Sequence, residues 1–131
     1  MGELKGETIG WLKKSESALQ AAELLQKQGL CSDSISRAYY AMFYAVKALL
    51  CQDDFSANKH SAVISAFGKL YVKTGKLQST LHKQLISAFE ERDKVDYDVL
   101  WEITEDSANQ RINVARSFIS EVMAFLEETQ P

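Results

Sequence analysis

Apolar residues recur along this chain every three or four positions, which is the spacing of helices that bury one face. No segment sustains the strict alternation of apolar and polar residues that is typical of a strand. The pattern predicts helices over residues 7–28, from a cap at Ser32 or Asp33 to Gln52, over 59–72, through 81–89 and over 104–128. We therefore expect an all-α protein.

Proline and glycine occur where they mark helix ends rather than interrupt helices. The one proline is residue 131, so nothing in the interior forces a helix to break. Gly29 and Gly75 follow predicted helices, at the position where a C-cap favours glycine. Short connections make neighbouring helices antiparallel. We expect residues 1–131 to form a single domain, an up-and-down antiparallel bundle of four to five helices.

The second predicted helix carries two apolar lines at helical spacing. The first consists of Ile35, Ala38, Tyr39, Met42, Val46, Leu49 and Leu50. The second consists of Arg37, Tyr40, Ala41, Tyr44, Ala48 and Cys51. A helix with two such lines is covered on both sides. In so small a domain, we expect the second line to meet another chain, as in a homodimer.

The amino-acid composition and net charge exclude several classes of protein. Apolar residues make up 46% of the chain and charged residues 25%, which is the balance of a globular protein. The net charge of −3 gives no basic footprint of the kind that a DNA-binding domain carries, so no DNA is expected. A local basic patch would still admit RNA. There is no glycine-rich phosphate loop and no cysteine–histidine zinc spacing, so no cofactor or metal is expected.

The cysteines and the amino-terminal segment bear on cellular location. Cys31 and Cys51 lie about 30 Å apart if one helix joins them, which is too far for a disulfide. The segment MGELKGETIG lacks the basic-then-apolar pattern of a signal peptide, and no apolar run approaches membrane-spanning length. We expect a cytoplasmic protein with no membrane contact.

The stretch RDKVDYD, residues 92–98, places five charges and a tyrosine between two apolar segments. If the fourth helix continues through it, Arg92 and Asp96 share a face. Charge runs usually face water, so a salt-bridged helix end is the plainer interpretation. The sharper one is a phosphate site, with Arg92 as a bidentate donor, Asp96 orienting it and Tyr97 supplying a hydroxyl or a ring. A metal site is disfavoured, because the acidic residues lack EF-hand spacing.

The two histidines lie in different predicted helices. Lys59 and His60 stand at the start of the third helix, where backbone N–H groups favour an anion such as phosphate. On spacing alone, His60 is a partly exposed residue of the capping turn. His82 follows Leu81 on the fourth helix and is expected at the surface.

Arg37 stands in SRAYYAMFYA, residues 36–45, where tyrosines recur at helical spacing. Such tyrosines are expected in a core or an interface rather than at a ligand. An arginine among buried rings needs a carboxylate, a carbonyl or a ligand. Asp96 or Asp98 is a candidate partner for Arg37.

Four segments in this order resemble the HEPN domain (higher eukaryotes and prokaryotes nucleotide-binding), in its short stand-alone prokaryotic branch. They are SRAYYAMFYA at 36–45, KHSAVI at 59–64, Phe67 with KTG at 73–75, and RDKVDY at 92–97. The resemblance covers about residues 8 to 128. It implies an antiparallel helical bundle that forms a homodimer.

The resemblance also implies an activity. Many members of the family are encoded beside a minimal nucleotidyltransferase and act with it as a toxin–antitoxin pair. The HEPN partner is the toxin, a metal-independent endoribonuclease. Its signature is an arginine followed, after four to six residues, by a histidine. The histidine can shuttle protons to the ribose 2′-OH, and the arginine stabilises charge on the phosphate.

Only half of that signature is present here. Arg92 fits the arginine, but the positions for the histidine hold Tyr97, Asp98 and Val99. A tyrosine with an ordinary pKa near 10 shuttles protons poorly at neutral pH. Two alternatives follow from the resemblance: His60 supplies the missing imidazole, or Tyr97 is the tyrosine that the nucleotidyltransferase modifies with AMP.

Three functions stay open. The leading hypothesis is a binding module that holds a nucleotide or an RNA phosphate through Arg92, with Asp96, Tyr97, Arg37 and Lys59 as further contributors. The second is an active endoribonuclease that pairs Arg92 with a non-standard base, His60. The third is a dimeric scaffold with no ligand.

Overall fold

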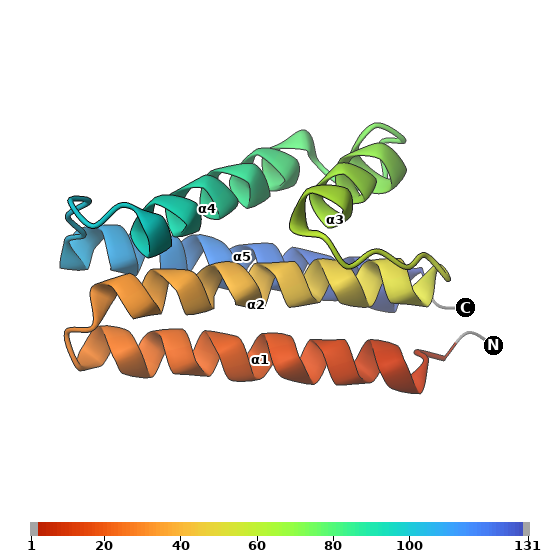
Figure 1. Ribbon diagram of the computed structural model, residues 1–131. Coiled ribbons are helices and arrows are strands. Elements are labelled where there is room, and N and C mark those ends of the chain that lie inside the picture. The colour runs from red at the N-terminus through yellow and green to blue at the C-terminus, as the bar shows by residue number, and fades with distance from the viewer. Residues whose placement is uncertain (1–2, 130–131) are drawn as a thin grey trace.

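Five α-helices account for most of the computed structural model, which describes residues 3–129 (Figure 1). They are, in chain order, α1 (Gly6–Lys27), α2 (Cys31–Gln52), α3 (His60–Phe67), α4 (Ser79–Tyr97) and α5 (Glu105–Glu128). A π-helical turn, η1 (Gly68–Val72), continues α3. Residues 3–129 contain no strand. The predicted all-α class is confirmed. α4 continues through most of the charged stretch to Tyr97, beyond the predicted range of 81–89.

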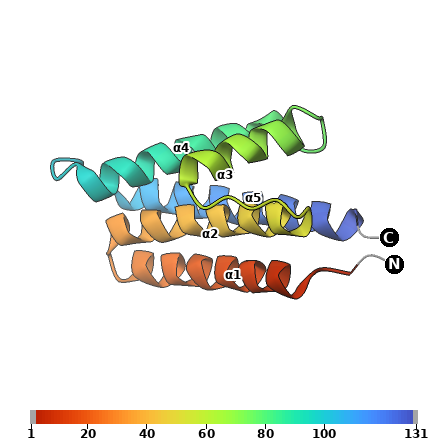
Figure 2. The same ribbon diagram turned by 45° about the vertical axis from the view of Figure 1, so that its right-hand side comes forward.

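The helices form a bundle with α2 inside it. Figures 1 and 2 show α1 and α2 as one antiparallel pair, α4 and α5 as another, and α3 and α4 on the side of α2 opposite α1. The chain departs from simple up-and-down order once, between α2 and α3. Residues 53–59 run back along α2, so that α3 begins over the middle of that helix rather than at its end (Figure 1). This return places the start of α3 beside the aromatic residues of α2.

The first apolar line of α2 forms the centre of the core, as predicted. Its members are almost wholly inaccessible to solvent: Ile35, Ala38, Tyr39, Met42, Val46, Leu49 and Leu50. α2 contacts α1, α3, α4 and α5, so nearly every direction around it is occupied by protein. Burial of this apolar surface is the main stabilising contribution to the bundle.

The second apolar line of α2 packs on α1. Ala41 and Ala48 are fully buried there. Ser15 of α1 donates a hydrogen bond to the Ala41 carbonyl at 2.7 Å, and the ring of Trp11 stacks on Tyr44 with centroids 5.8 Å apart. A helix at the centre of a bundle has two covered faces without any second chain. The two apolar lines are therefore no reason to expect a homodimer, which stays a prediction.

The turn between α1 and α2 depends on Gly29, which has φ +77°. Leu30 N–H donates to the Leu25 carbonyl and Gly29 N–H to the Gln26 carbonyl, so the predicted glycine ends α1 in a Schellman motif. The predicted cap at Ser32 or Asp33 is wrong. α2 resumes at once after the turn, with Leu30 as its N-cap and no side-chain cap.

His82 lies against Gly68 at the junction of α3 and η1, and its predicted surface position is wrong. The imidazole is half-buried, and its Nε2 lies 3.1 Å from the Ile64 carbonyl oxygen. A Cβ added at Gly68 would lie 2.6 Å from the Cε1 atom of His82. Only glycine leaves room for this ring, which joins α4 to α3.

We expect Gly68→Ala to lower the free energy of unfolding by about 1–3 kcal/mol, because the new methyl group displaces the His82 ring. Urea denaturation measures the change. Gly10→Ala is the matched control: no atom lies within 4 Å of its added Cβ, and alanine within a helix gains about 0.5–1 kcal/mol over glycine. In a His82→Ala background the penalty at Gly68 should disappear, and a penalty that persists there would contradict the role of His82.

Candidate functional site

The candidate site forms where the last turns of α4 and the first residue of α3 meet α2. We call Tyr39, Tyr40, His60, Arg92 and Asp96 the Arg92 cluster. Tyr39 and Tyr40 are successive residues of α2, His60 opens α3, and Arg92 and Asp96 lie one turn apart on α4. Residues from three parts of the chain are thus brought together by the packing of three helices.

Arg92 is held against both tyrosines. Its Nη2 donates a hydrogen bond to the Tyr40 hydroxyl at 2.7 Å, and its guanidinium lies 5.3 Å from the centre of that ring and 5.9 Å from that of Tyr39. Only 14% of the side chain is exposed. Such contacts between guanidinium and aromatic faces are attractive and fix the orientation of the group. The plainer interpretation of residues 92–98 as a solvated helix end therefore does not hold for Arg92, although its predicted ion pair with Asp96 is present.

Asp96 pairs with Arg92 one helical turn away, as the spacing predicted. One carboxylate oxygen lies 2.9 Å from Arg92 Nε, and the other accepts a hydrogen bond from Ser36 Oγ at 2.8 Å. The Nε contact is an ion pair that lacks hydrogen-bond alignment, so the buried Nε–H has no acceptor within residues 3–129. A buried donor without an acceptor is uncommon and destabilising. It is the feature of the cluster that a bound anion would satisfy.

His60 packs into the aromatic side of the cluster. Its Nδ1 lies 2.6 Å from the Tyr39 hydroxyl, and its ring stacks on Phe43 with centroids 4.4 Å apart. Tyr40 meets the imidazole edge-on at 5.6 Å. His60 is the partly exposed first residue of α3, as predicted. Its contacts with the rings of α2 were not predicted, because capping signals are local and these contacts come from another helix.

Burial and charge both act on the protonation of His60. Desolvation lowers the pKa of the imidazole, and the nearby Arg92 charge lowers it further. Burial also raises the pKa of the Tyr39 hydroxyl far above its usual range, so that this group stays protonated. At neutral pH the cluster therefore combines a neutral imidazole with a permanent cation.

Of the other predicted site residues, Lys59 and Tyr97 lie outside the Arg92 cluster and Arg37 contacts it at Tyr40. Lys59 is exposed and forms the N-cap of α3, and Tyr97 is 73% exposed on α4, one residue beyond Asp96. The guanidinium of Arg37 lies 4.8 Å from the centre of the Tyr40 ring.

The predicted carboxylate partner of Arg37 is not found among the described residues. Asp96 binds Arg92 and Ser36, and Asp98 accepts a hydrogen bond from Leu100 N–H at 3.0 Å. The face of Tyr40 and solvent satisfy Arg37 instead, since its side chain is only half-buried.

The chemistry of the cluster suits an anion rather than a cation. Within residues 3–129, no group of three or more His, Cys, Asp or Glu side chains is placed to hold a metal ion. None of the helices in that range is both long enough and apolar enough to cross a lipid bilayer. A guanidinium with an unused buried donor beside two hydroxyl groups can bind a phosphate oxygen.

We expect the pKa of His60 to lie below its ordinary value of 6.5. Arg92→Ala should raise this pKa without restoring 6.5, because burial is the larger cause. Since the unfolded chain binds the proton more tightly, the contribution of His60 to stability is complete above about pH 6.5 and is lost as the pH falls below it. An NMR titration of the imidazole, assigned with His60→Asn, measures the pKa. A value at or above 6.5 would contradict the packing of His60 in the cluster.

Comparison with known proteins gives the family. The chain is 36% identical to a "UPF0332 protein" of Thermotoga maritima over 90% of its own length and 89% of the relative. It is 33% identical to "Putative toxin MJ0142" of Methanocaldococcus jannaschii over 93% and 83%, and 30% identical to "Putative toxin MJ0605" of the same organism over 96% and 93%. The family model described as HEPN domain matches residues 10–127. With a match of this extent and the helical bundle described above, the chain belongs to the HEPN domain family.

Proposed function

We propose that this HEPN protein binds the phosphate of a nucleotide or of RNA at Arg92. The observation that carries the proposal is the Arg92 guanidinium, which is largely buried, is oriented by Tyr40 and is paired through Nε with Asp96 in an ion pair that lacks hydrogen-bond alignment. A guanidinium binds a phosphate in a bidentate manner when two of its N–H groups lie on one edge. Orientation by the two tyrosines reduces the entropy that such binding costs.

Asp96 is the group that a phosphate would displace from Arg92. Its carboxylate neutralises Arg92 while no phosphate is bound, and its other oxygen is held by Ser36. A phosphate carries more negative charge than a carboxylate and competes for the same guanidinium. On binding, Asp96 retains the Ser36 hydroxyl as a donor, so that displacement leaves no polar group without a partner.

The names of two relatives support a toxin-like role, which we place in the cytoplasm with a protein partner. Both names contain the word toxin. The family resemblance supports a homodimer and a minimal nucleotidyltransferase as partners. The exposure of Tyr97, 73%, supports its modification with AMP, because its hydroxyl is accessible to a second protein. Tyr97 lies five residues after Arg92, so an attached phosphate would stay close to the site.

A second candidate, the metal-independent endoribonuclease, is favoured by the position of His60. The neutral imidazole contacts the two tyrosines that hold Arg92. In the tautomer whose Nδ1–H donates to the Tyr39 oxygen, His60 Nε2 can accept the proton of a ribose 2′-OH while the 2′ oxygen attacks the phosphorus. The bond to the 5′ oxygen then breaks, the leaving oxygen takes a proton, and a 2′,3′-cyclic phosphate remains. Arg92 would stabilise the charge that develops on the phosphate.

Nucleotide binding tests the leading proposal. We expect calorimetric titration with ATP and GMP to show binding that Arg92→Ala weakens at least tenfold, because a hydrogen bond to a charged group contributes about 1.5–3 kcal/mol. Arg116→Ala is the control, since Arg116 forms an exposed ion pair with Glu23 on other helices. Equal binding by Arg92→Ala and the control would assign the nucleotide to another site. Absence of binding by the wild-type protein would favour the scaffold interpretation.

Cleavage of a mixed-sequence RNA in EDTA separates binding from catalysis. If the second candidate is correct, the wild-type protein cleaves, and both Arg92→Ala and His60→Ala reduce the rate at least a hundredfold, which is typical of losing a general base or a charge-stabilising group. The products should end in 2′,3′-cyclic phosphate. Cleavage that survives His60→Ala would exclude His60 as the base. No cleavage by the wild-type protein would leave the binding role.

A further inference from the structure

A row of three aromatic rings runs along the surface between α1 and α2. Trp11 of α1 stacks on Tyr44 with centroids 5.8 Å apart and planes inclined by 30°. Tyr44 lies 5.8 Å from Tyr40, with planes inclined by 37°. All three rings are half-buried, so each keeps part of its surface open to solvent.

Three cations lie over the same rings. Lys14 Nζ is 5.0 Å from the centre of Tyr44 and 5.5 Å from that of Trp11. Lys47 Nζ is 4.9 Å from the centre of Trp11, and Arg37 covers Tyr40. Within residues 3–129, none of these cations forms an ion pair with a carboxylate. We call these six residues the cation–aromatic stripe: Trp11, Lys14, Arg37, Tyr40, Tyr44 and Lys47.

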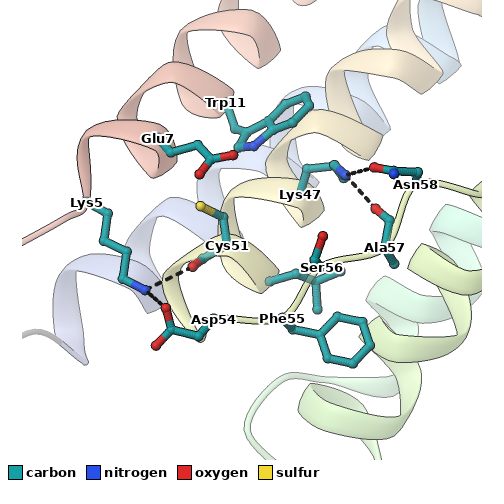
Figure 3. A pocket seen from close by; sticks show the side chains of 11 residues that line it. Lys5, Glu7, Trp11, Lys47, Cys51, Asp54, Phe55, Ser56, Ala57 and Asn58 are labelled. Carbon is teal, nitrogen blue, oxygen red and sulfur yellow. Dashed lines mark hydrogen bonds and ion pairs between the residues drawn. The ribbon is translucent and has the colours of Figure 1, made fainter.

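Each end of the stripe opens into a hollow. Lys13, Lys14, Arg37 and Tyr44 line one of about 400 Å³ between α1 and α2. The other, of about 350 Å³, lies between the start of α1 and the loop after α2 (Figure 3). There the Lys47 ammonium reaches the Ala57 carbonyl and Asn58 beside the Trp11 ring. The stripe is thus a hollowed surface and not a flat one.

We propose that the cation–aromatic stripe binds a segment of single-stranded RNA and leads it to Arg92. Sites for single strands combine cations that follow the phosphates with aromatic faces on which bases stack. Arg37 and Lys47 are ten residues apart on α2, or about 15 Å, which accommodates a few nucleotides. Tyr40 ends the row of rings, and its hydroxyl holds Arg92. The inference rests on the proposed phosphate site and extends it.

The charge of the stripe favours RNA over a second copy of the chain. Acidic groups lie near its ends: Glu7 and Asp54 line the hollow beside Trp11, Asp33 precedes Arg37 by one turn, and Asp96 is hydrogen-bonded to Ser36. A two-fold contact would place the same patch on both sides and set its central cations against each other. A polyanion meets no such repulsion. The overall charge of −3 does not oppose this, because the cations are gathered locally.

Binding of a fluorescein-labelled, single-stranded RNA of twelve nucleotides tests the stripe. We expect Lys14→Gln/Lys47→Gln to weaken this binding about tenfold and to make the slope of log K against log salt shallower by about 1.4, since each phosphate contact on a single strand contributes about 0.7. Tyr44→Leu should also weaken it while leaving the charge unchanged. Lys69→Gln/Lys73→Gln, which removes two exposed lysines at η1, is the charge-matched control and should bind as the wild type does.

The fluorescence of Trp11 reports directly on whether RNA bases stack on its ring. The chain has two tryptophans, so Trp101→Phe leaves Trp11 as the sole source of indole fluorescence. We expect the single strand to quench this fluorescence and a duplex of the same sequence to bind more weakly without quenching it, because duplex bases are already stacked.

The two proposals fail in different ways. If Lys14→Gln/Lys47→Gln and Tyr44→Leu bind the single strand as tightly as the wild type while Arg92→Ala loses GMP, the stripe is wrong and the phosphate site stands. If the stripe variants instead convert a dimer to a monomer in light scattering, with unchanged RNA affinity, the stripe is an interface between copies. Failure of the wild type to bind the strand overturns the stripe alone if GMP still binds, and both proposals if it does not.

Discussion

The site depends on one constraint: two tyrosine hydroxyl groups on the central helix α2 require hydrogen-bond partners. α2 lies inside the bundle, and Tyr39 and Tyr40 bring polar atoms into it. Hydroxyl groups that leave solvent need hydrogen-bond partners. A helix carbonyl can serve, as that of Ala41 does for Ser15, but the partners of these two tyrosines are side chains from other helices. His60 satisfies Tyr39 and Arg92 satisfies Tyr40. The packing of α3 and α4 on α2 is therefore specified by polar contacts as well as by apolar burial.

The sequence alone predicted the helices, since each one carries its own periodicity, although a side chain caps α5 and not α2. Gly29 shows how local such information is: the residue marks the turn, and the turn requires only neighbouring backbone groups. The pairing of Arg92 with Asp96 was predictable for the same reason, because one helical turn joins them. The position of His60 was not. It depends on residues 53–59 running back along α2, and no periodicity encodes the path of a loop.

The same limit explains why the second apolar line of α2 was misread. A period of three to four residues shows that a face is covered but not what covers it. Here α1 covers the small residues of that line, Ala41 and Ala48, and leaves the larger Tyr40 and Tyr44 at the edge of the contact. Small residues allow two helices to approach closely, and large ones then project beyond them. The rings of the stripe are half-exposed because the helix pair beneath them is tight.

Tyr40 belongs to both the stripe and the Arg92 cluster, and its ring is rigid. The face of the ring takes Arg37 and neighbours Tyr44, while its hydroxyl accepts a hydrogen bond from Arg92. Because a phenol cannot bend, any rotation that adapts the face to a stacked base also moves the oxygen that orients the guanidinium. The two parts of the surface are therefore coupled mechanically through one side chain. An RNA strand bound along the stripe would reach Arg92 beside Tyr40, the residue that orients Arg92. RNA binding at this surface would then not require the histidine of the family signature, whose absence bears on catalysis.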